Sequence, residues 1–394
     1  MQEIKVKPWY KMTELGVIPE DWEVKTFDEV FDITAWWDVK KECFSNIKTD
    51  KYRYPIFANA ISNKWVYWYS SVYDYTSPSL TITARWWIWY AFPRYENYCA
   101  IVRLLVLQPK LDVSVSLISD YVNKYTNFAN ESTWVPQLTK PQISKYRIIC
   151  PKYEEQKLIA KNLSDTDELI NSLDELIKKK EKLKEWTMQE LLTWKRRLPW
   201  FSWEWKEKTL KEICFINAWK SKSKFINKLW KYIIVDMWAV SDKWRLIISK
   251  FTNYNWDFLK KWDLIMPKDD IWWGFIIWKT AYIDSDNKYV LWDHVFKLTS
   301  KKDNSLFLNY MINWFQVNSE IKSKASGSAQ IWITKWAVEN QIIKLPNITE
   351  QKAISEVLSD MDNEIENLKI KRDKYKQIKE WMMQELLTWK TRLV

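Results

Sequence analysis

The sequence is poor in glycine, with 3 among 394 residues, whereas an average content of about 7% would give roughly 28. It holds 30 tryptophans instead, many of them where a chain must turn or a helix must end, which are places that favour glycine. Such positions are Trp36-Trp37, Trp86-Trp87, Trp272-Trp273 and Trp194. We hypothesise that most of these tryptophans are UGA codons that the source organism reads as glycine. A protein truly rich in tryptophan is the alternative.

Histidine and closely spaced cysteine are also scarce. The one histidine, His294, leaves no catalytic set built on several histidines, and beside a strand-like segment it is interpreted as structural. The four cysteines (Cys43, Cys99, Cys150 and Cys214) form none of the close pairs that zinc sites and redox motifs use. We therefore expect buried thiols, no metal and no cofactor.

Long apolar runs are missing as well. No stretch of about 18 uncharged apolar residues is present that would span a bilayer. The first residues, MQEIKVKPWYKMTELG, lack the apolar segment of a secretory signal. We expect no membrane partner and a cytoplasmic location.

The charge balance is basic, with a net charge of +11 and a pI of about 9.1. Lysine and arginine neutralise phosphates and release counterions, so this balance favours double-stranded DNA as a partner. The signal is weak alone, because A/T-rich genomes also produce lysine-rich proteins.

An internal repeat is the clearest feature. Residues 155–198 align without a gap on residues 350–393, and 24 of the 44 positions are identical. Both copies are rich in Leu, Glu, Lys and Gln and contain no proline. They follow Pro151 and Pro346. They are predicted to be long helices, with Thr349 as the N-cap of the second. About 40 residues would make a rod of roughly 60 Å.

The second copy carries an apolar stripe with steps of three and four, which is typical of a coiled coil. Its members are Leu358, Met361, Ile365, Leu368, Tyr375, Ile378, Met382 and Leu386. In the first copy Ile170, Leu173, Ile177 and Leu183 continue the pattern, which Lys180 interrupts. The two helices are predicted to pack on each other; two amphipathic helices on separate cores are the alternative.

The segments that open each half also correspond. Residues 21–36 and 204–219 share Trp22/Trp205, Thr26/Thr209, Glu29/Glu212, Ile33/Ile216 and Ala35/Ala218. Trp22 and Trp205 are therefore expected to be genuine tryptophans. The interiors diverge and are dominated by strand-like runs such as LTITA, IVRLLVL, YIIVDM and VFKLTS. Each half is predicted to be a mixed α/β domain followed by a helix.

These segments resemble the specificity subunits of type I restriction-modification enzymes. The similarity is carried by TELGVIPEDWEVKTFDEVFDI, EQKLIAKNLSDTDELI, MQELLTWKRRLPWF and SWEWKEKTLKEI, and glycine in place of tryptophan in LLTWKRRLPWF improves it. The resemblance implies two target recognition domains (1–150 and 199–346), each reading half of an interrupted DNA sequence. It also implies spacer helices (151–198 and 347–394), packed as an antiparallel coiled coil, that dock two modification (methyltransferase) subunits. Restriction subunits would join this core.

Motifs of an enzyme are missing. A methyltransferase would need a glycine-rich cofactor loop and an N/D-P-P-Y/F tetrapeptide, and neither occurs even if tryptophan is read as glycine. No catalytic residue is therefore assigned. Glycine at Trp273 and Trp278 would create the P-loop pattern in residues 273–280, but a P-loop must lead into a helix. The following AYIDSDNKYVL is predicted to form strand, turn and strand.

The candidates for DNA contact are polar residues in loops beside the predicted strands, where side chains reach groove edges and lysines reach phosphates. In the first domain they are Asn59, Asn63, Lys64, Arg85, Ser132, Gln137, Thr139 and Lys140. In the second they are Lys220, Ser221, Lys222, Lys224, Ser326, Ser328, Gln330, Thr334 and Lys335. The mixed charges of residues 174–185 are interpreted as a solvated helix face.

Two other classes of function stay open. A non-catalytic coiled-coil adaptor with two protein-binding domains fits the repeat but not the basic charge. A fused nuclease or methyltransferase conflicts with the missing motifs.

The glycine hypothesis makes a direct prediction about the native protein. Mass spectrometry of peptides that cover positions 194 and 389 should find glycine, because both positions end a predicted helix. Tryptophan at both would refute the hypothesis.

Overall fold

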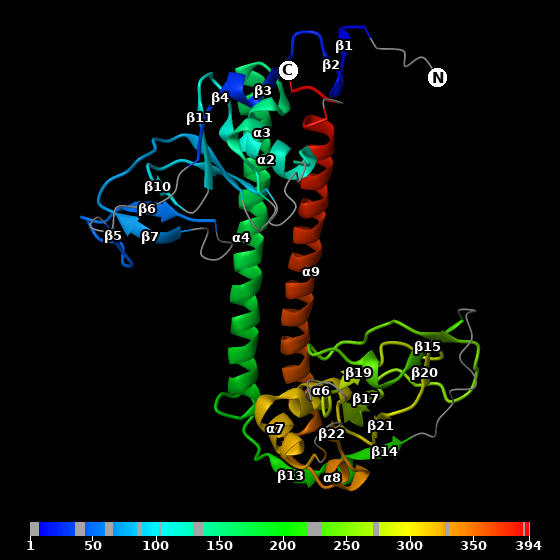
Figure 1. The fold of residues 1–394 in the computed structure, drawn as a ribbon. Helices are drawn as coiled ribbons and strands as arrows, with labels where there is room; N and C mark the ends of the chain where they lie inside the picture. Colours follow the sequence, from blue (N-terminus) through cyan, green and yellow to red (C-terminus); the bar gives the residue numbers. More distant parts are fainter. Residues whose placement is uncertain are drawn as a thin grey trace. The chain divides into compact units, whose positions relative to one another are not determined.

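The structure is a computed structural model that describes residues 8–35, 44–59, 66–84, 89–101, 104–128, 137–218, 231–270, 276–325, 327, 331–388 and 391–393. It divides into two compact units (Figure 1). Unit 1 comprises Met1–Leu173 and Lys371–Val394, and unit 2 comprises Asp174–Ile370. Both boundaries fall inside long helices. Each unit therefore contains the first part of one long helix and the last part of the other.

The two long helices are α4 (Tyr153–Leu192) and α9 (Ile348–Leu386), which confirms the prediction of a long helix in each repeat. The predicted N-cap of the second is wrong. The side-chain oxygen of Asn347, not that of Thr349, accepts a hydrogen bond from the backbone N–H of Glu350 at 2.9 Å. An asparagine one residue before the helix satisfies an N–H that would otherwise lack a partner.

The apolar stripe of α9 is buried or half-buried at all eight predicted positions. In α4, Ile177 is buried but the side chain of Leu183 is 45% exposed, so its assignment to the stripe is wrong. Lys180 and Lys184 take the inner positions and form ion pairs with α9. Counting in helical steps from Ile177 leads to positions 180, 181 and 184, and places 183 on the outer face.

Within each unit the helix segments run antiparallel. In unit 1, Asp167 of α4 binds Lys379 of α9 at 2.5 Å. In unit 2, Lys184 of α4 binds Asp362 of α9 at 2.7 Å. The two pairs are related by the repeat: Asp167 corresponds to Asp362, and Lys379 to Lys184.

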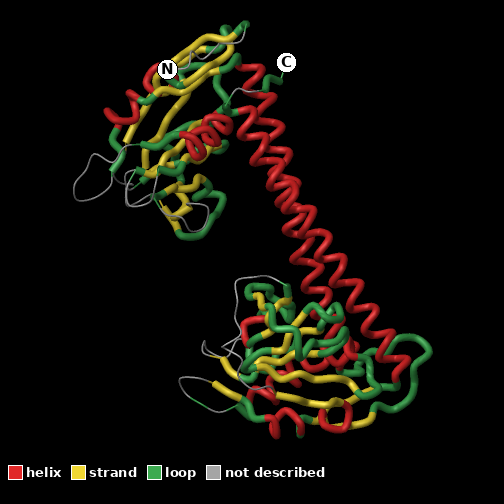
Figure 2. The backbone as a smooth tube through the Cα atoms, turned by 90° about the vertical axis from the view of Figure 1, so that its right-hand side faces the viewer, coloured by secondary structure: helices red, strands yellow, loops and turns green. Residues whose placement is uncertain are grey.

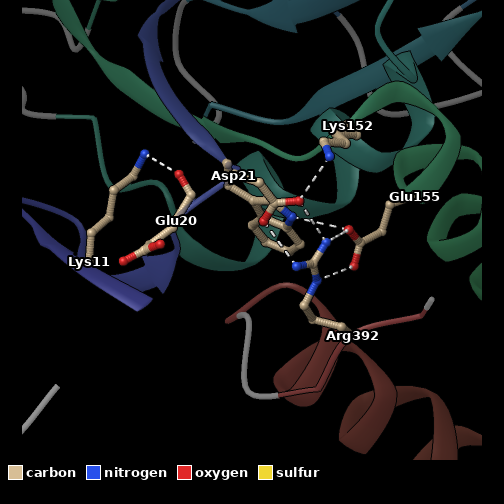
Figure 3. A network of polar contacts seen from close by, with 7 residues as sticks. Lys11, Glu20, Asp21, Lys152, Glu155 and Arg392 are labelled. Carbon is tan, nitrogen blue, oxygen red and sulfur yellow. Dashed lines mark hydrogen bonds and ion pairs between the residues drawn. The ribbon is translucent and has the colours of Figure 1, made fainter. Parts of the chain in front are cut away.

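A second repeated contact joins the end of one copy to the start of the other. In unit 1, Arg392 binds buried Glu155 at 2.7 Å and Asp21 at 2.9 Å (Figure 3). The indole N–H of Trp22 also donates to Glu155, at 3.1 Å. In unit 2, the corresponding Arg197 binds Glu350 at 2.6 Å, and this carboxylate is 1% exposed. We call these contacts the two arginine clasps.

The contacts in the clasp of unit 1 stabilise the charged forms of Arg392 and Asp21. Hydrogen bonding to Glu155, opposed by burial, raises the pKa of the Arg392 guanidinium. Burial would raise the pKa of Asp21, but hydrogen bonds from Arg392 and Lys152 outweigh it and hold the pKa below its usual value. Charge-assisted bonds of this kind are about twice as strong as neutral ones.

The sheets of unit 1 follow two orders, β4-β11-β8-β9 and β10-β6-β7-β5, with two further strand pairs, β1-β2 and β12-β3. The strands are β1 (Tyr10–Thr13), β2 (Gly16–Pro19), β3 (Glu23–Thr26), β4 (Phe31–Ala35), β5 (Phe44–Ser45), β6 (Tyr54–Phe57), β7 (Val66–Ser70), β8 (Ser79–Thr83), β9 (Ala91–Arg94), β10 (Cys99–Ala100), β11 (Leu104–Pro109) and β12 (Arg147–Cys150). The helices are α1 (Phe27–Val30), α2 (Val115–Tyr125) and α3 (Lys140–Lys145).

The sheets of unit 2 have the orders β14-β21-β17-β19 and β16-β15-β20, with the pairs β13-β23 and β18-β22. The strands are β13 (Lys206–Thr209), β14 (Cys214–Ala218), β15 (Tyr232–Val235), β16 (Phe251–Thr252), β17 (Leu264–Pro267), β18 (Asp269–Asp270), β19 (Ala281–Tyr282), β20 (Tyr289–Leu291), β21 (Val295–Ser300), β22 (Ile331–Trp332) and β23 (Ile342–Leu345). The helices are α5 (Leu210–Ile213), α6 (Ser305–Asn313), α7 (Phe315–Ser323) and α8 (Lys335–Glu339).

The predicted mixed α/β fold is thus present in both units, and all four strand-like runs contain strands. In each unit the strands (yellow in Figure 2) form the globular part, and the segments of the long helices pack against it. Three cysteines, Cys99, Cys150 and Cys214, are buried free thiols, as predicted. No helix in the described ranges is long and apolar enough to cross a membrane.

The sequence anchors shared by the two halves are structural. Thr26 with Glu29, and Thr209 with Glu212, form capping boxes at the starts of α1 and α5. The strand before each box pairs with the last strand of the same globular part, β3 with β12 and β13 with β23. Each divergent interior is therefore closed by a repeated strand pair.

The backbone supports the glycine hypothesis. Of ten described non-glycine residues with positive φ, seven are tryptophan: Trp9, Trp89, Trp194, Trp200, Trp244, Trp262 and Trp278. Bulky side chains rarely adopt this left-handed conformation, which glycine adopts freely. Trp194, with φ 50°, lies two residues after the last residue of α4, just after the helix as predicted. Trp22 differs, because its fully buried ring belongs to the clasp of unit 1. Trp36-Trp37, Trp86-Trp87, Trp272-Trp273 and Trp389 lie outside the described residues.

Trp200 offers a test in the chain as it stands, since its φ is 76° and its side chain is 97% exposed. Trp200→Gly should raise the free energy of unfolding by about 1 kcal/mol, because it removes backbone strain and little packing. Nearby Trp203 is 64% exposed and lacks a positive φ. Trp203→Gly should lower the free energy of unfolding in the same denaturant titration. Equal effects of the two substitutions would contradict the strain argument.

One position beside the paired helices differs between the units. The N-caps of α2 and α6, Ser114 and Asn304, each donate a backbone N–H to a repeated glutamine, Gln156 or Gln351, at 2.9 Å. Six residues after the cap, Tyr310 donates its hydroxyl to Asp362 at 2.7 Å in unit 2. Unit 1 has Asp120 at that position. Burial raises the pKa of Asp120 to about 6, with Lys379 opposing this rise and Asp167 adding to it.

This raised pKa predicts a pH dependence of stability. Folded Asp120 holds its proton more tightly than the unfolded chain, so stability falls as pH rises from about 4 to about 6. Asp120→Asn should raise the free energy of unfolding by about 1–2 kcal/mol at pH 7, allowing for partial exposure, and give no gain below pH 4. Denaturant titrations at both pH values measure this difference. Asp112→Asn, at an exposed site, is the control, and an equal gain at both pH values would contradict the prediction.

Candidate nucleic-acid interface

Several chain segments meet at one end of the sheet β14-β21-β17-β19 in unit 2. β14 ends at Ala218, which pairs with Phe296 near the start of β21. β17 ends at Pro267, which pairs with Val295. The next residue, Lys268, accepts a hydrogen bond from the N–H of Ile333 at 3.0 Å. We call this edge the loop end of unit 2.

Unit 1 has a matching loop end in the sheet β4-β11-β8-β9. β4 ends at Ala35, which pairs with Leu105 near the start of β11. β8 ends at Thr83, which pairs with Leu104. The N–H of Leu138 donates to the carbonyl of Ala84 at 2.9 Å, and Leu138 corresponds to Ile333 in the repeat. The two loop ends therefore share one construction.

Candidate segments adjoin these ends in the sequence. In unit 2, the segments with Lys220 and with Thr334 adjoin Ala218 and Ile333 in sequence. In unit 1, the segments with Arg85 and Gln137 adjoin Ala84 and Leu138. Candidates 114 residues apart in unit 2 and 52 residues apart in unit 1 thus adjoin, in the sequence, residues at one edge of a sheet.

Six candidates lie among the described residues. Asn59 is half-buried and lies two residues after the end of β6. The carbonyl of Phe57, the last residue of β6, accepts a hydrogen bond from the N–H of Ile101, three residues before β11 begins at Leu104. Gln137 is half-buried beside Leu138. Lys140 and Lys335 are exposed at the first positions of α3 and α8. Thr139 and Thr334 precede these lysines.

The two threonines have a structural role as helix caps. The backbone N–H and hydroxyl of Thr139 donate to the side chain of Gln142 at 2.8 and 2.9 Å. The hydroxyl of Thr334 accepts from the N–H of Ala337 at 3.1 Å. The caps fix where α3 and α8 begin, and so where Lys140 and Lys335 stand.

The other eleven candidates lie outside the described residues: Asn63, Lys64, Arg85, Ser132, Lys220, Ser221, Lys222, Lys224, Ser326, Ser328 and Gln330. They remain predictions.

Three residues that were not among the candidates also stand at the loop end of unit 2. They are Lys268, Asp269 and His294, and the N–H of Lys268 donates to the carbonyl of His294 at 2.8 Å. His294 was interpreted as structural, and Asp269 has no pattern in the sequence that marks it. The signal that would have found them is their position at strand ends, directly after β17 and before β21.

The P-loop-like segment does not lead into a helix. Thr280 is followed by strand β19, as predicted. Burial lowers the pKa of Lys279, and its ammonium donates to the carbonyl of Asp242 at 2.7 Å. This lysine is held by the protein itself. Among the described residues, no group of three His, Cys, Asp or Glu side chains is placed to hold a metal ion.

Comparison with known proteins identifies the family. The profile of a family described as "Type I restriction modification DNA specificity domain" matches residues 19–185 and 203–375. The chain is 28% identical over 284 residues to the type I restriction enzyme MjaVIII specificity subunit of Methanocaldococcus jannaschii. That match covers 67% of this chain and 66% of the relative. The chain thus spans slightly less than two thirds of that relative's length.

Two solved structures share the fold. The S subunit of a type I restriction-modification system from M. genitalium superposes with a TM-score of 0.63 at 14% identity, covering 93% of this chain and 96% of that one. A second comes from work on complex assembly and conformational transition of the type I R-M system, with a TM-score of 0.53 at 13% identity, covering 94% and 98%. Because the family profile matches two long segments that cover most of the sequence, the chain belongs to the family of type I restriction-modification DNA specificity domains and carries two of them.

Proposed function

We propose that this chain is the DNA-recognition subunit of a type I restriction-modification complex. The observation that carries the proposal is the combination of two family matches with two loop ends of one construction and different residues. A repeated frame around two unlike interiors suits a protein that reads the two halves of an interrupted DNA target. We assign target recognition to residues 1–150 and 199–346.

The long helices form the spacer in this proposal. Residues 151–198 and 347–394 pack as an antiparallel coiled coil, which the repeated pairs Asp167–Lys379 and Lys184–Asp362 support. The spacer sets the distance between the half-sites and docks two modification subunits, and restriction subunits join that complex. The likeness to a structure from work on complex assembly of the type I R-M system supports assembly into a complex. The chain itself supplies recognition and no catalytic group.

The loops supply phosphate contacts. Lys220, Lys222 and Lys224 follow in sequence the last residue of β14, Ala218, which lies at the loop end of unit 2. Lysines that neutralise phosphates contribute affinity that falls steeply with salt. We assign these three to backbone contact and the polar side chains nearby to base reading.

Methylation mapping of the host genome, followed by binding assays, tests the proposal. Mapping should reveal a bipartite methylated motif, and the purified chain with its modification partner should bind a duplex carrying that motif in preference to a scrambled one. Absence of sequence preference would favour a protein-binding adaptor. Methyl transfer by the chain alone would favour an enzyme.

Charge reversal tests the lysine assignment. Changing Lys220, Lys222 and Lys224 to Glu should weaken binding at least about tenfold at low salt and flatten the salt dependence. The matched control reverses Lys211, Lys301 and Lys302, which are exposed at the opposite end of the same sheet, where Cys214 pairs with Ser300. Unchanged affinity after the first reversal, or an equal loss in the control, would contradict the assignment.

A further inference from the structure

His294 joins three segments at the loop end of unit 2. It directly precedes β21, which lies between β14 and β17 in the sheet. Its carbonyl accepts from the N–H of Lys268, whose own carbonyl accepts from the N–H of Ile333. The backbone of His294 is therefore held by Lys268, which is held in turn by Ile333.

The imidazole is held by a buried acid. Its Nδ1 lies 2.5 Å from a carboxylate oxygen of Asp269, and the two side chains are 53% and 10% exposed, respectively. A carboxylate only accepts hydrogen bonds, so Nδ1 carries the hydrogen and donates it. The ring is fixed in rotation while half of its surface faces outward. No described residue forms a hydrogen bond with Nε2.

The backbone at this position does not call for histidine. His294 has a φ of 61°, a conformation that glycine and asparagine adopt more readily. Asn287 provides that alternative elsewhere in unit 2, with a φ of 55°. If this position served only to form a turn, asparagine would suffice. If the imidazole had only a structural role, it would be buried. An imidazole fixed by a buried carboxylate and half exposed is arranged for contact with a partner.

We propose that His294 is a specificity-determining residue that reads a base edge in the half-site bound by unit 2, and that Asp269 is its positioning residue. This inference rests on the proposed function. With Nδ1 donating to Asp269, Nε2 of the neutral ring is an acceptor. It matches the exocyclic amino groups that adenine and cytosine present in the major groove.

The test uses the full chain with its modification partner and three synthetic duplexes. One carries the motif found by methylation mapping, and each of the others has one half of that motif scrambled. His294→Asn keeps a residue that tolerates the left-handed backbone but removes the imidazole. Discrimination at one half-site should fall about tenfold, and discrimination at the other should stay unchanged. Asp269→Asn should reduce discrimination at the same half-site by a smaller factor, because the ring is held less firmly.

Asn287→Gly is the matched control, since Asn287 is exposed and also left-handed, and it should change neither half-site. A lowered melting temperature of the His294→Asn variant with unchanged discrimination would show a structural role and overturn the inference. Equal weakening on all three duplexes would indicate a phosphate contact and also overturn it. If the wild-type chain discriminates neither half-site, the proposed function fails and the inference falls with it.

Discussion

The buried carboxylates at the start of the long helices constrain the whole architecture. Glu155 and Glu350 are 6% and 1% exposed, and a buried charge without a partner is strongly destabilising. Each is neutralised by an arginine from the other copy of the repeat, Arg392 or Arg197. The start of one copy is therefore stable only when the end of the other lies beside it. Neither copy of the repeat completes its own charge balance.

This exchange explains which parts of the sequence agree between the halves. The repeated residues are those that hold helix, cap and strand pair together: the clasps, the glutamines after the buried carboxylates, and the Thr–Glu capping boxes. Positions next to this frame vary between the halves. Tyr310 in unit 2 donates to Asp362, whereas unit 1 has at the same position a half-buried acid, Asp120, whose pKa is affected by burial, Lys379 and Asp167. The side chains at the loop ends take no part in these repeated contacts, so they can differ between the halves without breaking them.

The sequence predicted the frame well and the candidate site only in outline. Helix periodicity located both long helices, and alternating or β-branched runs located the strands, because these signals are local. It misplaced Leu183, since a stripe interrupted by Lys180 was continued by sequence spacing, whereas the long lysines bind across the helix pair. It misjudged Thr349 because Asn347 offers an equally good cap. Among the candidates, Thr139 and Thr334 have polar side chains that cap helices, a role that composition does not distinguish from DNA contact. The juxtaposition of Lys268, His294 and Ile333 depends on strand register between distant segments, which no local pattern encodes.

The division of the chain between the units also bears on its synthesis. Unit 2 is one continuous stretch, whereas unit 1 consists of the first 173 residues and the last 24. Since domains generally fold as units while the ribosome still extends the chain, unit 2 can be complete before unit 1. The half that is translated first thus lacks a partner for Glu155 until Arg392, which is translated after all of unit 2, has been added. A ribosome that stops after unit 2 but before Arg392 would release a chain in which unit 2 can fold and unit 1 keeps Glu155 without its arginine.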